Sequence, residues 1–476
     1  MHAIYLIILA LYEVAVIVAI IHVITDNRQP VKTMAWALVI YFVPIIGLIL
    51  YIFLGINTRK ERIVSQRSLD QLSRRQMLGF AEQGDQMAAS SGKHHQMISL
   101  FSRLSASLPF RGNRIDIFTD GYSYFLDLLK EIGRARHHIH IDQFIIDDDP
   151  LGMLLADALI DKARQGVEIR IVYDDVGCWH TRSYFFERLR SNGIEVCPFL
   201  PVRFMPFLSK VNYRNHRKLI IIDGLVGYIG GFNIALRYIK GADGKGWRDT
   251  MIKVIGQGTY GIQKSFLIDW FFVDQTLISN RKYYPTPHYE ISNDLTIQTV
   301  TCGPTSAYPE IMQGFISAIL SAKNYVFIET PYFLPTEPIL LSLKTAALAG
   351  IDVRLIIPRK ADSLLVNWAC RSYIREAMLS GVKIYLYSPA FLHSKLMVVD
   401  DNLCTCGSTN IDFRSFDNNF EANAFIYDEE TSVRFRNIFL DDLKSATCLN
   451  DVNPKKRPSL PIRLWEGLMR LVSPLL

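Results

Sequence analysis

One sparse motif occurs twice in the chain, and this repetition constrains the fold more than any other feature. "NHRKLIIID" begins at Asn215 and "HSKLMVVD" begins at His393, and both continue to a Gly-[Gly/Ser]-x-Asn segment. The full pattern, H-x-K-x4-D-x6-G-[GS]-x-N, is present in both places without a gap. A duplication kept only for structure would preserve apolar positions, not an outward-facing His, Lys and Asn. The motif therefore predicts two related halves that share one site.

The segments around the motif repeat as well. "YSYFLDLLKEIGRARHHIHIDQFII" resembles "YPEIMQGFISAILSAKNYVFIETPYFL", and each predicts an amphipathic helix followed by a buried strand. Two further pairs, "KARQGVEIRIVYDD" with "AALAGIDVRLIIPR" and "RLRSNGIEVCPF" with "AMLSGVKIYLYS", each predict a helix end, a glycine and a strand. The expected fold class is α/β, with two pseudo-twofold-related repeats that are mixed sheets flanked by helices.

The N-terminal residues are strongly apolar and predict a two-helix transmembrane hairpin over residues 1–57. Residues 33–56 carry no charge and are long enough to cross a bilayer core. Residues 3–24 are nearly as apolar but contain Glu13, which is costly in lipid unless it faces a neighbouring helix or an interface. A cleaved signal peptide is the alternative, but the segment has no basic start and no small-x-small cleavage site.

Basic residues set the expected orientation of this hairpin. The segment after the second span, "NTRKERIVSQRS", is rich in Arg and Lys, whereas the short loop between the spans holds two basic residues. The positive-inside rule then places the residues after 58 in the cytoplasm. The seven cysteines form no CxxC pair, which agrees with a reducing compartment and predicts no metal site.

The other boundaries follow from composition. Residues 58–107 are polar and predict a tether with some helix, and the two repeats are expected at 108–285 and 286–448. The tail, 449–476, begins basic and then places apolar residues, including Trp465, at helical intervals. This basic amphipathic pattern fits an interfacial helix and equally fits a segment packed on the domain.

The motif residues suit chemistry on a phosphodiester. His216 and Lys218 lie two apart on a predicted strand, so their side chains face one way, and the same holds for His393 and Lys395. The lysines can neutralise charge on the phosphate, and the amides of Asn233 and Asn410, with Ser408 as support, can hold its oxygens. One imidazole can attack phosphorus while the other protonates the leaving alkoxide.

The acidic residues have two expected roles. Asp223 and Asp400 complete the catalytic motif, but Asp223 has the opposite parity to His216 and precedes a glycine, so it is expected to fix a strand end. Asp249, in "GWRDT", and Glu421, in "DNNFEAN", follow their histidines at matching places in the repeat. We expect these two acids to orient the imidazoles, although ordinary surface acids are the alternative.

Three other patterns are better explained by structure than by chemistry. "GQGTYG" at 256–261 looks like a dinucleotide loop but lacks a following βαβ unit, so a tight turn is expected. "HHIH" at 137–140 corresponds to "YVF" in the other repeat, which favours strand packing, and His94–His95 are expected to be solvated. The apolar stretch "CPFLPVRFMPFLSKVNYR" predicts either a lipid-contacting lip, with Phe204 in it, or a core-packed loop.

The double motif resembles that of the phospholipase D superfamily, over roughly residues 108–446. The apolar N-terminal pair, "YRNHRKLIIIDG", "GWRD" and the terminal "SPLL" are similar to the bacterial cardiolipin synthases within it. The resemblance implies that two phosphatidylglycerol molecules give cardiolipin and glycerol at a bacterial plasma membrane, with no metal or other cofactor. It also implies that His216 forms a phosphatidyl-histidine and His393 is the acid and base, a choice that the symmetry of the motifs leaves open.

Other readings remain at this point. A hydrolytic phospholipase D, releasing phosphatidic acid, would use the same chemistry with water as acceptor. A phosphodiesterase or nuclease of the superfamily, or any nucleic-acid partner, is disfavoured because no dense Lys/Arg face interleaved with aromatics is present. A non-enzymatic scaffold would leave two complete motifs unexplained. The expected partners are phosphatidylglycerol and membrane lipids, and a homo-oligomer stays open.

Overall fold

The computed structural model describes residues 2–25, 30–43, 45–51, 92–202, 213–241, 244–278, 280–286, 291, 293, 295–304, 306, 308–450 and 459–473. The chain forms two compact units, Met1–Ile63 with Val202–Asn212, and Val64–Pro201 with Tyr213–Leu476. The larger unit contains both copies of the motif.

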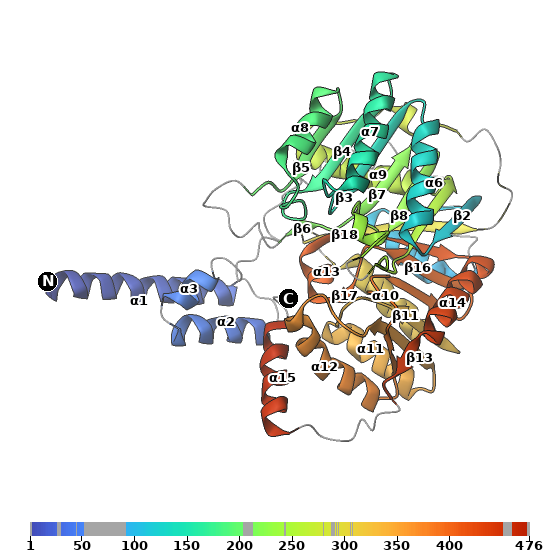
Figure 1. Cartoon of the computed structure of the whole chain (residues 1–476). Coiled ribbons are helices and arrows are strands. Elements are labelled where there is room, and N and C mark those ends of the chain that lie inside the picture. Colours follow the sequence, from blue (N-terminus) through green and yellow to red (C-terminus); the bar gives the residue numbers. More distant parts are fainter. Residues whose placement is uncertain are drawn as a thin grey trace. The chain divides into compact units, whose positions relative to one another are not determined.

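Two sheets with the same strand order form the larger unit, one for each half of the duplication (Figure 1). The first runs, in spatial order, β2 (Asn113–Phe118), β9 (Met251–Gly256), β8 (Val226–Gly230), β7 (Lys218–Ile222), β3 (His138–Gln143), β4 (Glu168–Asp174) and β5 (Glu195–Phe199). The second repeats this order in β10 (Thr296–Cys302), β18 (Asn419–Tyr427), β16 (Leu403–Gly407), β15 (Leu396–Val399), β11 (Tyr325–Glu329), β13 (Asp352–Pro358) and β14 (Lys383–Tyr387).

The expected mixed sheets are confirmed. The β3–β4–β5 and β11–β13–β14 neighbours are parallel, and the other neighbours in the two strand orders given above are antiparallel. Two short strands extend the second sheet at its edges, β1 (Pro109–Phe110) beside β10 and β19 (Ala446–Cys448) beside β14. β1 was expected to belong to the first repeat, but it pairs with a strand of the second sheet.

Helices cover both faces of each sheet. Those of the first half are α6 (Gly121–Arg134), α7 (Pro150–Arg164), α8 (Ser183–Ser191) and α9 (Thr259–Asp274). Those of the second half are α10 (Glu310–Ser321), α11 (Glu337–Leu348), α12 (Leu364–Leu379) and α14 (Glu429–Lys444). Side-chain caps begin several of them: Asp120 accepts from the Ser123 amide at α6, and Asp428 from the Thr431 amide at α14.

The shorter elements are η3 (Gly92–His94), α5 (His95–Ser105), β6 (Arg214–Asn215), η5 (Leu236–Tyr238), η6 (Arg281–Tyr283), β12 (Phe333–Leu334), β17 (Ile411–Asp412), α13 (Phe413–Asp417) and α15 (Leu460–Val472). Of these, α15 contacts α12, and β12 pairs with β17 in a small parallel sheet.

A core between the two sheets joins the halves. Leu219 and Ile221 of β7 face this central core together with Val398 of β15, whereas Ile220 and Ile222 face an outer core beneath α6 and α7. A strand that is buried on both faces needs apolar residues at every position, which explains the uninterrupted "LIII" that follows Lys218.

Short strand contacts cross from each half to the other. β6 runs parallel to the start of β18, with Asn215 opposite Phe420. In the reciprocal place, Arg248 forms a parallel bridge with Leu392. Each contact lies immediately before a motif histidine on one side and before a predicted orienting acid on the other. This reciprocity is what a twofold relation between the halves produces.

The polar segment 58–107 is not a tether throughout. Its described part, residues 92–107, forms η3 and α5, and three apolar side chains of α5 lie in the core of the second half: Met97, Ile98 and Phe101. His94, which was expected to be solvated, lies with its ring 5.2 Å from that of Tyr427, and burial lowers its pKa. The amphipathic spacing of apolar residues within "HHQMISLFSRLS" accounts for this helix, although the surrounding composition is polar.

The smaller unit contains α1 (His2–Thr25), α2 (Pro30–Phe42) and α3 (Ile46–Leu50). A small cluster of Ala19, Val23, Ile40 and Tyr51 packs α1 against the other two. The second span expected over 33–56 is not one continuous helix within the described residues, and the hairpin is not confirmed: α2 and α3 are separate, Ile45 has a positive φ, and the sequence has Pro44 between them, which lacks the amide a helix needs. Within the described part of the chain, none of the helices combines the length and the apolar character that a membrane span needs.

Candidate active site

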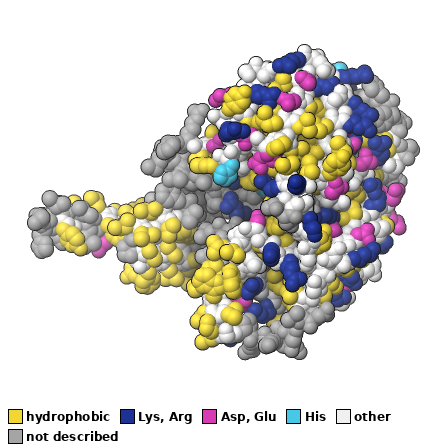
Figure 2. Space-filling view, in the orientation of Figure 1, with side chains coloured by type: hydrophobic (Ala, Val, Ile, Leu, Met, Phe, Trp, Pro, Cys, Tyr) yellow, Lys and Arg dark blue, Asp and Glu magenta, His cyan; other side chains and the backbone are white. Residues whose placement is uncertain are grey.

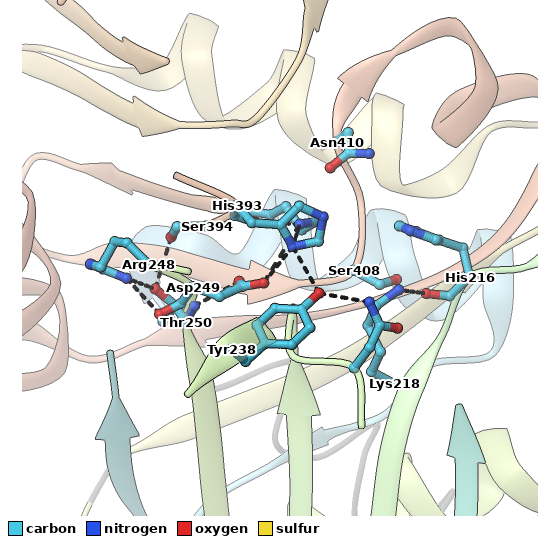
Figure 3. A network of polar contacts seen from close by, with 12 residues as sticks. His216, Lys218, Tyr238, Arg248, Asp249, Thr250, His393, Ser394, Ser408 and Asn410 are labelled. Carbon is cyan, nitrogen blue, oxygen red and sulfur yellow. Dashed lines mark hydrogen bonds and ion pairs between the residues drawn. The ribbon is translucent and has the colours of Figure 1, made fainter. Parts of the chain in front are cut away.

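The two motif histidines lie where the halves cross. His216 follows β6, and its amide donates to the Phe420 carbonyl at 2.9 Å. His393 precedes β15, and its amide donates to the Arg248 carbonyl at 2.7 Å. These bonds fix each histidine against the strand that carries an acid of the opposite half. Figure 3 shows both imidazoles in one site, with Lys218, Ser408 and Tyr238 beside them.

Glu421 is the partner of His216. Its two carboxylate oxygens both lie 3.0 Å from Nδ1 of His216, and the glutamate is fully buried. The Ser408 hydroxyl donates to the same carboxylate, and Asn419 Nδ2 donates to it at 3.2 Å. Ser408 therefore supports the acid rather than standing free in the site.

Asp249 is the partner of His393. Its Oδ2 lies 2.5 Å from His393 Nδ1, and the Thr250 amide donates to its Oδ1 at 2.7 Å. Tyr238 Oη lies 3.4 Å from the same ring nitrogen. The buried Asp249 carboxylate favours the tautomer with the proton on Nδ1, which leaves Nε2 of His393 as the unprotonated nitrogen.

The acids are exchanged between the halves. Asp249 follows His216 in sequence but bonds to His393, and Glu421 follows His393 but bonds to His216. Both predicted acids do contact motif imidazoles, so the surface-acid alternative is wrong. Their order in the sequence suggests the same-half partner, and the crossing strands bring them instead to the opposite half.

Both motif lysines are buried beside their own histidines. Lys218 Nζ donates to the His216 carbonyl at 2.6 Å, and Lys395 Nζ donates to the His393 carbonyl. Burial lowers the pKa of Lys218 to about 7, with the positive charge of Lys395 adding to the effect. Burial likewise lowers the pKa of Lys395. Two ammonium groups that repel one another in a buried site favour the binding of an anion between them.

Both imidazoles are neutral in this site. Burial lowers the pKa of His216 to about 4 and that of His393 to about 3, even though each has a carboxylate partner that acts in the other direction. The lysine of the opposite half lowers the pKa of each histidine further, which shows how closely the two motifs approach. Every hydrogen bond that the described residues make to these rings uses Nδ1.

Asp223 and Asp400 lie at the other ends of their strands. The Asp223 carboxylate accepts the backbone amides of residues 136, 137 and 138 at 2.8 to 3.0 Å. Asp400 accepts those of residues 323, 324 and 325 at 2.6 to 2.9 Å. Both follow a strand in a tight turn with positive φ, as the Asp-Gly pattern predicted for Asp223 and the repeat predicted for Asp400. Their place in the catalytic set is corrected: they anchor β3 and β11 to β7 and β15, and among the bonds of the described residues neither contacts a motif histidine or lysine.

The two motif asparagines differ in their surroundings. Asn233 Nδ2 donates to Tyr238 Oη at 2.7 Å, and its Oδ1 accepts the Ile145 amide at 3.3 Å, so its side chain is engaged within the protein. Asn410 is 5 % exposed, and no protein group within the described residues bonds to its Oδ1. Figure 3 shows Asn410 apart from the bonded network. Of the pair, Asn410 is the one whose amide remains available for a ligand.

Two arginines behind the acids were missed by the sequence reading. Arg217 forms a buried ion pair with Asp269, and its Nε donates to the Glu421 carbonyl at 3.2 Å. Arg248 pairs with Asp442 at 2.6 Å and donates to the Asp249 carbonyl at 2.6 Å. They occupy different motif positions, one beside a histidine and one beside an acid, so comparing the two copies could not reveal them.

Tyr238 was also missed, because its signal is absent from the other copy. It lies five residues after Asn233, where the second half has Ser415 after Asn410. It bonds to Asn233 and lies beside His393.

The patterns set aside as structural are confirmed as such. "HHIH" lies in β3, where His138 and His140 are buried and bond to Gln263. "GQGTYG" forms the turn from β9 into α9, and the Gly258 amide donates to Asn113 Oδ1 at 2.7 Å. No group of side chains suited to a metal ion occurs among the described residues. The predicted lip, including Phe204, lies mostly outside the described residues.

Comparison with known proteins agrees with this geometry. Residues 128–243 and 315–443 match the family model described as cardiolipin synthase, PLD-like domain, and residues 14–55 match the phospholipase D-nuclease N-terminal model. The chain is 37% identical over 470 residues to the major cardiolipin synthase ClsA of Bacillus subtilis, covering 97% of each chain. It is 37% identical to a cardiolipin synthase of a Geobacillus strain, covering 95% of this chain and 90% of that one.

A solved structure shares the fold. Phosphatidylserine synthase from Haemophilus influenzae superposes with a TM-score of 0.63 and 14% identity, covering 80% of this chain and all of the other. The full-length similarity and the duplicated site together show that the chain belongs to the cardiolipin synthase family of phospholipase D-like proteins.

Proposed function

We propose that this chain is a cardiolipin synthase, a phosphatidyltransferase that moves the phosphatidyl group of one phosphatidylglycerol onto a hydroxyl of a second and releases glycerol. One observation carries the proposal: two neutral imidazoles, each bonded through Nδ1 to an acid of the opposite half, share a buried site with two lysines. Such a site provides a nucleophile, a proton carrier and charge for a single phosphodiester.

In the first step, Nε2 of His216 attacks phosphorus. The new P–N bond forms as the P–O bond to the departing glycerol breaks. His393, which takes up a proton from solvent at Nε2 when the phosphodiester binds, gives that proton to the departing oxygen. Glu421 stabilises the charge that develops on the His216 ring. Lys218, Lys395 and Asn410 hold the phosphoryl oxygens. The choice of His216 as nucleophile rests on its place in the N-terminal motif.

The second step frees His216 and restores the proton on Nε2 of His393. A hydroxyl of the second phosphatidylglycerol gives its proton to Nε2 of His393 and attacks phosphorus, and the P–N bond to His216 breaks. A phosphodiester brings negative charge between the two lysines, which raises the pKa of both imidazoles above the values that burial gives them. His393 can then carry the proton between the two steps, with Asp249 stabilising its charged form.

We also propose that the N-terminal segments attach the enzyme to the bacterial plasma membrane, with the catalytic unit on the cytoplasmic side. Large apolar side chains along α1 and α2 are exposed, among them Leu11 at 65% and Phe42 at 70%. Exposed apolar surface of this kind is unfavourable in water and favourable in lipid. The basic residues that follow, Arg59 to Arg67, support this orientation.

The reaction is tested with the purified chain, micelles of phosphatidylglycerol labelled in its glycerol headgroup, and a chelator. Cardiolipin and free labelled glycerol in equal amounts are expected. Phosphatidic acid as the main product would contradict transfer and indicate hydrolysis. His216→Ala should abolish both products, while His137→Ala, a matched change at an exposed histidine outside the site, should retain full activity.

A further inference from the structure

The C-terminal helix α15 presents its polar side to the protein and its apolar side outward, which is the reverse of an ordinary surface helix. Its polar side chains face the protein: Glu466 is 3% exposed and binds Arg375 through both oxygens, at 2.8 and 3.2 Å. Arg470 donates to Glu376 at 2.9 Å, and Ser473 bonds to Tyr373 at 2.9 Å. Bonds to α12 thus fix which side of α15 faces outward.

The outward side of α15 is apolar. Six large side chains are exposed along it: Leu460, Ile462, Leu464, Trp465, Leu468 and Leu471. Leu471 is 77% exposed and Leu460 is 65% exposed. Figure 2 shows hydrophobic side chains gathered over α15. A surface helix in water normally buries this face, so the arrangement marks an interface with something apolar.

A cavity of about 510 Å³ lies between α15, α12 and the carboxyl ends of β13 and β14, within the ~300–1,000 Å³ range of ligand pockets. Its walls are mainly apolar and include Phe333, Ile374, Met378 and Ile462. Arg359 and Arg371 also line it. No carboxylate pairs with either arginine within the described residues. Both residues are exposed, and the Arg371 guanidinium lies 4.0 Å from the centre of the Trp368 ring.

This cavity is distinct from the catalytic site. None of the motif histidines, lysines, asparagines or acids lines it. It is nevertheless only one strand away, because Phe333, which forms part of its wall, pairs through β12 with Ile411, the residue after Asn410.

We propose that this cavity is an accessory site for an anionic phospholipid, holding an acyl chain while Arg359 and Arg371 bind the phosphate, with the apolar side of α15 seated in the same leaflet. The three features agree in chemistry: an apolar cavity, two arginines at it that form no ion pair among the described residues, and an outward apolar helix with a tryptophan. A zwitterionic lipid would fill the cavity but gain less from the arginines. The proposal is separate from phosphatidyl transfer and does not depend on it.

Binding is measured with the full-length chain in neutral detergent micelles, titrated with acyl-brominated phosphatidylglycerol, which quenches nearby tryptophan. The His216→Ala background prevents turnover. The signal of interest is the difference between this chain and the same chain with Trp465→Phe. We expect Trp465-dependent quenching, with half-saturation at a lower lipid fraction for brominated phosphatidylglycerol than for brominated phosphatidylcholine.

The paired variant Arg359→Gln/Arg371→Gln should remove most of this headgroup preference, by about fivefold for each arginine. The matched control Arg114→Gln/Arg164→Gln changes two exposed arginines elsewhere and should change nothing. Ala361→Phe narrows the cavity and should weaken the binding of both lipids. A circular dichroism spectrum that matches that of the parent shows that this variant is folded.

Three results would overturn the accessory site. These are absence of Trp465-dependent quenching, equal quenching by the two lipids, or a preference that survives the paired arginine change. Competition by millimolar inorganic phosphate at constant ionic strength would instead assign the arginines to free phosphate and would also refute lipid binding. None of these outcomes would change cardiolipin formation by the active chain in detergent. The accessory site and the proposed function can therefore be refuted independently of one another.

Discussion

At the scale of single residues, the site depends on the different roles of the two nitrogens in each imidazole. Nδ1 of both rings is bonded to a buried acid, and this leaves Nε2 for the substrate. Because each acid comes from the other half, neither half can orient its own histidine. The exchange also allows the two proposed steps to be separated by experiment, since the acids serve different histidines.

The reaction rates of Glu421→Gln and Asp249→Asn should depend differently on the leaving group of the substrate. Each change should lower transfer from phosphatidylglycerol by about 10²–10⁴-fold, because an amide stabilises an imidazolium far less than a carboxylate does. A p-nitrophenyl phosphodiester needs little proton donation, so Asp249→Asn and His393→Ala should recover most of their rate of nitrophenol release. Glu421→Gln and His216→Ala should not. Equal recovery of both sets would contradict the assignment of His216 as nucleophile.

The lysines predict an alkaline limit to activity. Lys218 has a pKa lowered by burial to about 7, so it loses its charge as the pH rises above 7. Phosphate binding to the free enzyme should weaken there, and kcat/KM should fall with rising pH while kcat falls at a higher pH, because bound phosphate raises the lysine pKa. A pH-rate profile in mixed micelles measures both. A flat kcat/KM from pH 6 to 9 would refute this role for Lys218.

At the scale of strands and turns, the motif aspartates hold the sheets together. Each accepts three backbone amides that begin a neighbouring strand. Asp223→Ala should therefore lower the free energy of unfolding by about 2–3 kcal/mol, since three backbone amides lose a charged acceptor, while kcat of the folded fraction stays within about threefold. Denaturant unfolding and active-site titration measure the two effects. The matched change Asp161→Ala, at an exposed residue of α7, should alter neither.

Matching positions in the two copies also differ in how well they tolerate substitution. A Cβ at Gly231 would lie 2.0 Å from Asp249 Oδ1, whereas the equivalent Ser408 uses its hydroxyl to support Glu421. Gly231→Ala should displace Asp249 and reduce kcat by at least about 10²-fold. Ser408→Ala removes one hydrogen bond and should cost about tenfold or less. Equal losses, measured as initial rates on phosphatidylglycerol, would mean that the crowding at Gly231 is relieved elsewhere.

At the scale of the whole molecule, buried neutral histidines in both halves make the fold sensitive to acid. Burial lowers the pKa of His138 to about 4, that of His216 to about 4 and that of His393 to about 3, below the ~6.5 of an unfolded histidine. The unfolded chain then binds more protons between pH 6.5 and 4, so stability should fall with decreasing pH across this window, by up to ~1.4 kcal/mol per unit for each histidine. Denaturant midpoints at pH 7 and 5 measure this. A His138→Gln chain should lose less stability between them.

The sequence predicted much of the molecule because its signals are local. Period-two apolar runs and helix–glycine–strand segments are properties of neighbouring residues, and the paired copies confirmed one another. The same reasoning predicted some helix in the polar segment but not that α5 packs into the core, and it did not predict the separation of α2 from α3, between which the sequence has Pro44. Both errors came from average composition over a long window.

By itself, the sequence determined that two motif copies meet in one phosphate-directed site on a duplicated α/β frame. Outward His, Lys and Asn residues repeated at fixed spacing have no other simple use. Only the tertiary structure decided that Glu421 serves His216 and Asp249 serves His393, because that choice depends on parallel contacts between segments far apart in the chain. It also decided that α15 turns its apolar side outward: a helical pattern states that one side is apolar, and packing alone determines which way that side faces.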